Sequence, residues 1–151
     1  ERACEGRAPS TGVSHRKAQR SRSSERLVVL VDTSVWIRAL AGKQPFRSAV
    51  DRLLLDEEVL GHEMVFAELL VGDAAGRART LSLYEQFSYA GTIPHREVVD
   101  LVRTRRLFGR GIGWIDAHLI ASALVTRVPL YTADAPLAKI ANELGIGYRA
   151  D

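Results

Sequence analysis

The sequence predicts an α/β fold in which helices cover a mostly parallel β-sheet. The first observation is the run Leu27-Val28-Val29-Leu30-Val31, which is apolar throughout, as strands buried on both faces of a sheet are. The second is that short runs of the same kind recur along the chain, and segments with helical periodicity separate them. Strands that alternate with helices are typical of a parallel sheet with helices packed on it.

In the first half of the chain, capping residues and glycines mark where helices begin and end. The helix after the first strand follows Thr33 and Ser34, and either hydroxyl is able to cap its first turn. Gly72 ends a later helix, because glycine is frequent just beyond helix C-termini. The strands are expected at residues 27–31, 59–60 and 92–93, and the helices at 35–40, 46–57, 63–71 and 77–89.

In the second half, one expected helix is more apolar than any other in the chain. It covers residues 114–126, and the glycines Gly109, Gly111 and Gly113 form a flexible connection before it. The other helices are expected at residues 96–108 and 135–144, and the strands at 129–131 and 146–148.

The positive charge of the chain is concentrated near its N-terminus. The 151 residues carry a net charge of +3. Residues 1–26 hold seven basic and three acidic residues, a net charge of +4, and residues 27–151 hold 14 basic and 15 acidic ones, a net charge of −1. Because residues 1–26 have almost no large apolar side chains to offset their ordering entropy, we expect a disordered basic segment there and one folded domain over 27–151. A basic arm that binds RNA is the alternative interpretation.

Composition excludes several classes of protein. The single cysteine, Cys4, rules out a framework of internal disulfides and is typical of a reducing compartment, so we expect a cytoplasmic protein. No apolar run approaches the roughly 20 residues that a membrane-spanning helix needs, so no membrane association is expected.

Four acidic residues occupy positions that are typical of ligand-binding or catalytic side chains. Asp32 follows the first buried strand and Asp134 follows the strand at 129–131, and open parallel sheets bind ligands just beyond such strand ends. Asp116 and Glu68 lie in helices whose neighbouring residues are mostly apolar. A lone carboxylate in such surroundings is unfavourable unless it is paired, protonated or bound to a metal. No Arg or Lys stands within three residues of any of the four.

A convergence of these four carboxylates would create a metal site. Their charges would raise one another's pKa, and a divalent cation relieves that repulsion. Oxygen ligands favour a hard ion, so Mg²⁺ or Mn²⁺ is expected rather than Zn²⁺. Each acid also has an ordinary structural interpretation: Asp32 as a helix cap, Asp116 as a complement to a helix dipole, and Glu68 as a solvated helix residue. The residues alone leave both interpretations open.

Four segments, in this order, carry a family resemblance. They are the segments 31–37, 61–62 together with 68–72, 106–124, and 131–134. They resemble the corresponding segments of VapC-type toxins of the PIN-domain family. The segment Arg-Leu-Phe-Gly-Arg-Gly-Ile-Gly-Trp-Ile-Asp-Ala-His-Leu-Ile-Ala-Ser-Ala-Leu at 106–124 is the most specific of them, and the resemblance covers residues 28–148.

The resemblance implies a three-layer α/β/α sandwich and a Mg²⁺- or Mn²⁺-dependent endoribonuclease. The implied catalytic and metal-binding residues are Asp32, Glu68, Asp116 and Asp134. It also implies an RNA substrate and a small cognate antitoxin protein that blocks the site, and we expect a homodimer. The family often has basic residues on both sides of the last acid, where this chain has alanines, so substrate contacts beside that acid differ here.

Polar and basic residues near the acids extend the expected site. The hydroxyl-bearing residues are Thr33, Ser34 and Thr132, and the arginines are Arg103, Arg105, Arg106 and Arg110. The hydroxyls either hold a metal-bound water or a phosphate oxygen, or cap helices. The arginines either bind RNA phosphates or form a solvated helix face.

Other prominent side chains have structural interpretations. His62 and His118 are expected to be structural or surface residues, because His118 lies two positions from the acid on its helix and so points away from it. Trp36 and Leu40 are expected to pack in the core or against an antitoxin helix.

Two other functions compete with the toxin ribonuclease. A catalytically weak RNA-binding or regulatory module on the same fold is the first, since fold alone does not determine function. The presence of all four acids argues against it. A phosphatase of the haloacid-dehalogenase type is the second, because Asp32 ends a strand, but those enzymes usually have a second aspartate where this chain has Ser34.

Overall fold

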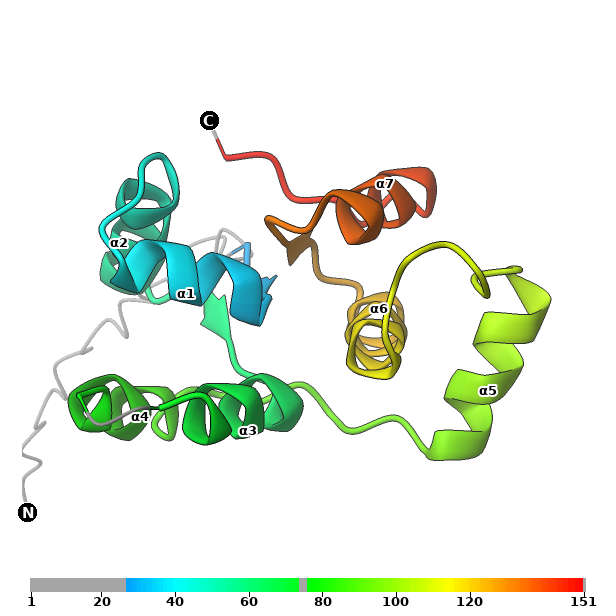
Figure 1. Ribbon diagram of the computed structural model, residues 1–151, viewed down its shortest axis with the longest axis horizontal. Helices are drawn as coiled ribbons and strands as arrows, with labels where there is room; N and C mark the ends of the chain where they lie inside the picture. The colour runs from blue at the N-terminus through cyan, green and yellow to red at the C-terminus, as the bar shows by residue number, and fades with distance from the viewer. Residues whose placement is uncertain (1–26, 74–75, 151) are drawn as a thin grey trace, which may run out of the picture.

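A parallel sheet runs through the centre of the molecule (Figure 1). The computed structural model describes residues 27–73 and 76–150, so the disorder expected for residues 1–26 lies outside the described residues. In the described part the sheet has three strands in the order β2-β1-β3. They are β1 (Val29–Val31), β2 (Val59–Leu60) and β3 (Leu130–Tyr131). β1 is buried along its whole length, as its uninterrupted apolar sequence predicts.

The helices lie on both faces of this sheet, which confirms the predicted three-layer α/β/α sandwich. In Figure 1, α1, α2, α3 and α4 lie to the left of the strands, α6 and α7 lie to the right of them, and α5 is outermost beside α6. The helices of the described residues are α1 (Thr33–Leu40), α2 (Phe46–Leu55), α3 (Glu63–Val71), α4 (Ala78–Tyr84), α5 (His95–Thr104), α6 (Trp114–Thr126) and α7 (Ala135–Glu143).

The edges of the sheet differ from the sequence prediction. In the described part of the chain, the strand expected at 92–93 is absent, and an isolated bridge between Gly61 and Tyr89 takes its place. Ile93 is apolar because it packs with residues of α5 and α6, and it pairs with no strand. At the other edge the strand expected at 146–148 is reduced to a bridge between Leu130 and Gly147.

Several helix boundaries also differ from the prediction. α1 begins at Thr33, so Thr33 and Ser34 lie inside its first turn and do not cap it. α4 ends at Tyr84 and α5 at Thr104, several residues earlier than expected. Arg106, just beyond α5, has a φ of 52°, a left-handed conformation that a continuing helix excludes.

The core joins the sheet to the helices on both sides. Leu30 of the central strand pairs with Leu60 on one side and with Leu130 on the other, and all three are buried. α6 contributes the longest buried stretch, from Ala117 to Ala123. None of the helices among the described residues is long and apolar enough to cross a membrane.

Candidate active site

Asp32 lies at the carboxyl end of the central strand, where its side chain is only 4% exposed. Its backbone N–H donates to the carbonyl of Tyr131 on β3, at 2.9 Å, so the ends of the two strands are held together. The Asp32 Oδ2 atom accepts hydrogen bonds from the Ser34 hydroxyl, at 2.5 Å, and from the Thr132 hydroxyl, at 2.8 Å. The Asp32 side chain does not cap α1, which contradicts the capping interpretation of this residue.

The two hydroxyls that hold Asp32 are themselves held by the backbone after β3. The Ser34 Oγ atom accepts from the backbone N–H of Ala133, and the Thr132 Oγ1 atom accepts from that of Asp134, each at 3.0 Å. Each hydroxyl therefore accepts from the backbone and donates to the carboxylate, which leaves Asp32 little freedom to rotate.

Glu68 points from α3 toward the beginning of α1. Its Oε2 atom accepts a hydrogen bond from the Thr33 hydroxyl, at 2.5 Å. The residue is half-buried, so it is not the freely solvated helix residue of the alternative interpretation. Thr33 and Ser34 thus orient one acid each.

Asp116 is the acid whose pKa responds to the charges of the other three. Its Oδ2 atom accepts from the backbone N–H of Gly113, at 2.7 Å, at the beginning of α6. Burial raises the pKa of its carboxyl, the Gly113 hydrogen bond lowers it, and the charges of Asp32, Asp134 and Glu68 raise it further. The structure therefore brings four carboxylates that are far apart in the sequence into one electrostatic neighbourhood.

Asp134 caps a helix, a role that the sequence did not predict for it. Its Oδ1 atom accepts from the backbone N–H of Leu137, at 2.9 Å, and so caps α7. Capping and participation in the acidic cluster are compatible, because the second carboxylate oxygen has no hydrogen-bond partner among the described residues.

All four carboxylates share one hydrogen-bonding pattern. Each has one oxygen anchored by a hydrogen bond, and the other has no such partner in residues 27–73 and 76–150. Four oxygen donors of this kind fit a hard divalent cation in chemistry. Within the same residues the side chains form no closed group of three or more donors that could hold an ion as they stand. Uncompensated negative charges repel one another, which opposes a closer approach.

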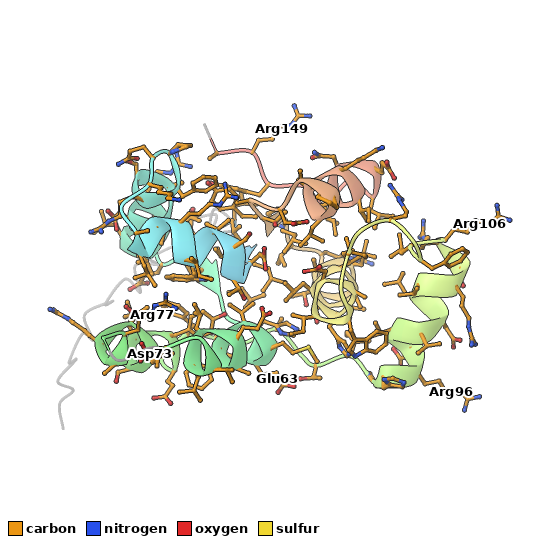
Figure 2. All side chains as sticks on the ribbon, in the orientation of Figure 1. Glu63, Asp73, Arg77, Arg96, Arg106 and Arg149 are labelled. Carbon is orange, nitrogen blue, oxygen red and sulfur yellow. The ribbon has the colours of Figure 1, made fainter. Side chains whose placement is uncertain are left out.

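The predicted RNA-binding arginines lie outside this cluster. Arg103, Arg105 and Arg106 are exposed, and Arg106 extends outward from the end of α5 (Figure 2). Arg110 is half-buried and pairs with Glu143 of α7, at 2.7 Å. None of these arginines is among the charges that shift the pKa of Asp116.

Both histidines near the site are buried, as their structural interpretation predicts. The His62 Nδ1 atom accepts from the backbone N–H of Met64 and so caps α3, and its Nε2 atom lies 3.0 Å from the Ser122 hydroxyl. Burial lowers the pKa of His62 and favours the neutral ring. Burial likewise lowers the pKa of His118. Trp36 is also buried, against Tyr84, so it lies in the core and not on an exposed helix face.

A groove of about 600 Å³ adjoins the acidic cluster, and the sequence analysis did not predict it. Thr33 and Glu68 form its polar part. Its other lining residues are Ile37, Met64, Ala67, Val71, Gly72, Trp114 and Ile115. They come from α1, α3 and the beginning of α6, so only the packing of these helices creates the groove.

The chain matches a known protein family over most of its length. Residues 29–143, which include all four acids, match the PIN domain family. The chain belongs to the PIN-domain family. This PIN domain is 38% identical over 120 residues to the protein named ribonuclease VapC32 of Mycobacterium tuberculosis, a match that covers 79% of this chain and 94% of that protein.

Solved structures share the fold of this PIN domain. The crystal structure of PAE2754 from Pyrobaculum aerophilum superimposes with a TM-score of 0.51 at 18% identity, over 80% of this chain and 97% of that one. The crystal structure of FitAcB from Neisseria gonorrhoeae gives a TM-score of 0.53 at 22% identity, over 76% of this chain and 94% of that one.

Proposed function

We propose that this PIN domain is a metal-dependent endoribonuclease and the toxin of a toxin–antitoxin pair. Asp32, Glu68, Asp116 and Asp134 are its catalytic and metal-binding residues, with Mg²⁺ or Mn²⁺ as cofactor. The observation that carries the proposal is that each of the four acids has one oxygen held by a hydrogen bond and one without such a partner among the described residues. The contribution of the other three acids to the raised pKa of Asp116 supports it. The relative named ribonuclease VapC32, which matches over most of both chains, supports the choice of RNA as substrate.

In this proposal each residue has a task that its contacts suggest. A divalent ion, when bound, supplies an activated water and stabilises charge on the phosphoryl group. The hydroxyls of Ser34 and Thr132 hold Asp32 in one orientation, and Thr33 does the same for Glu68. The unpartnered oxygen of each carboxylate faces no competing hydrogen bond from the described residues. Preorganised acids of this kind bind a cation without first having to be ordered.

The partners follow from the same proposal. A cognate antitoxin would keep the nuclease inactive, and a homodimer would be the form of the free toxin. The activity belongs in the cytoplasm, where a toxin of this kind meets RNA. These assignments rest on the resemblance to VapC-type toxins and on the relative named ribonuclease VapC32.

The decisive experiment is cleavage of RNA by purified protein. With Mg²⁺ or Mn²⁺ we expect cut RNA whose new ends map to defined positions, and with EDTA we expect intact RNA, since removal of the ion removes water activation. Induction of the gene in its host should arrest growth, and co-expression of the cognate antitoxin should restore it.

A catalytically weak RNA-binding module is the second candidate function. It is favoured by one observation, that the acids among the described residues form no closed donor group without an ion. Such a module would bind RNA and leave it uncut in the presence of Mn²⁺. Harmless induction of well-folded protein would support it against the ribonuclease.

The arginines at the end of α5 provide a separate test of RNA binding. If Arg103, Arg105 and Arg106 contact phosphates, their joint replacement by alanine should reduce the slope of log K against log salt by roughly 0.7 per contact for single-stranded RNA. Binding is measured by titration at several salt concentrations. An unchanged slope would assign these exposed side chains to a solvated face.

A further inference from the structure

Trp114 is the first residue of α6 and is held in one orientation although it is partly exposed. Its ring centroid lies 4.9 Å from that of His95 on α5 and 4.9 Å from that of His118 on α6. Even so, 42% of the residue is exposed. An indole that is already ordered binds a flat ligand without a large loss of side-chain entropy.

The exposed part of Trp114 belongs to the groove beside the acidic cluster. Glu68 and Thr33 line the same groove. A ligand in this groove is therefore in reach of the Glu68 carboxylate and of the indole together. Ile37, on α1, is a further lining residue and is 45% exposed. Exposed apolar surface grouped in one groove marks a binding site.

We propose that Trp114 is a substrate-binding residue, on which a base of the RNA strand stacks while the adjoining phosphate lies at the carboxylates. This inference rests on the proposed ribonuclease function. Proteins that bind single-stranded RNA hold its bases on aromatic side chains. The lining residues of the groove include no Lys or Arg, and Glu68 is ionisable, so the groove favours a neutral base over the anionic backbone.

Tryptophan fluorescence tests the stacking directly. The chain has two tryptophans, and the other one, Trp36, is 2% exposed and packs in the core against Tyr84 and Phe87. A stacked base therefore quenches Trp114 alone. In EDTA, a short single-stranded oligoadenylate RNA should quench the fluorescence, and the same strand without its bases should not. The variant Trp114→Leu should show no quenching.

Steady-state cleavage separates binding from chemistry. Loss of one stacked base should raise KM of Trp114→Leu by about 5- to 150-fold, with kcat nearly unchanged, because Trp114 does not touch the reacting phosphate. Trp114→Phe keeps an aromatic face and should lose much less. Phe108→Leu is the matched control: it makes the same kind of change from an aromatic to an aliphatic side chain at an exposed residue outside the groove, so its KM should match that of the wild type.

The outcomes distinguish this inference from the function on which it rests. Wild-type protein that cleaves RNA without any quenching of its fluorescence overturns the stacking role and leaves the ribonuclease intact. Failure of the wild type to bind or cleave any RNA refutes both. If Trp114→Leu and Ile37→Ala both retain the wild-type KM but lose affinity for the antitoxin, the groove binds protein and the inference is wrong. The fluorescence of the wild type is decisive even if Trp114→Leu does not fold.

Discussion

Asp116→Asn should abolish RNA cleavage in the presence of Mg²⁺ or Mn²⁺, with kcat reduced on the order of a hundredfold or more, as for other preorganised electrostatic groups. The asparagine keeps an oxygen that accepts from the Gly113 N–H, so the beginning of α6 is preserved. What it removes is the negative charge that the proposed ion requires. Steady-state cleavage of a labelled RNA by the folded variant is the measurement.

The matched control for this substitution is Asp100→Asn. Asp100 is exposed on α5 and takes no part in the acidic cluster, so the same chemical change there should leave kcat unchanged. Circular dichroism and melting of both variants verify their folding. A folded Asp116→Asn protein that cuts RNA at the wild-type rate would contradict the proposed mechanism.

Metal-dependent stability is the second large effect that we expect. A ligand that binds only the folded state stabilises it by about 2.7 kcal/mol at a hundred times its dissociation constant. Wild-type protein and Asp100→Asn should both gain stability of this size when Mn²⁺ is added. Asp116→Asn should gain much less, because one of the four carboxylates is missing. Thermal melts with Mn²⁺ and with EDTA measure the difference.

The same thermal melts, repeated in EDTA at several pH values, test whether the other three acids raise the pKa of Asp116. Burial, followed by the charges of Asp32, Asp134 and Glu68, raises the pKa of Asp116 above its ordinary value of 3.8. The folded protein then binds this proton more tightly than the unfolded chain, so wild-type stability falls as the pH rises from 3.8 through the raised pKa. At neutral pH, metal-free Asp116→Asn should therefore melt above the wild type, and this advantage should vanish in acid. Equal stability of the two proteins at all pH values, together with equal Mn²⁺ responses, would separate Asp116 from the cluster.

The periodic and highly apolar elements could be predicted from the sequence. The run at 27–31 contains the central strand because a strand buried on both faces is apolar at every position. The helix at 114–126 was predicted with its observed bounds, since its glycine-rich start and apolar body are both local signals. The strand predicted at 92–93 was wrong because Ile93 is buried by packing on α5 and α6, and burial by helices leaves the same apolar signal as burial in a sheet.

The candidate acids could likewise be named from the sequence, but their arrangement could not. Asp32 and Asp134 stand out because each follows a strand, and Asp116 and Glu68 stand out because their neighbours are apolar. Which hydroxyl holds which acid depends on contacts across the fold: Thr132 is 100 positions from Asp32, and Thr33 is 35 positions from Glu68. Local patterns carry no information on such pairs.

The sequence by itself determined the α/β class, the central strand and the most apolar helix, and it named the four candidate acids, because each of these has a local signal in periodicity or composition. Only the tertiary structure decided that the other three acids raise the pKa of Asp116. It also decided that Trp36 is buried while Trp114 is exposed, and that α1, α3 and α6 leave a groove between them. The physical reason is that the exposure of a side chain and the field at a carboxylate depend on which helices pack beside it. That packing is a property of the whole core, and neighbours in the sequence do not encode it.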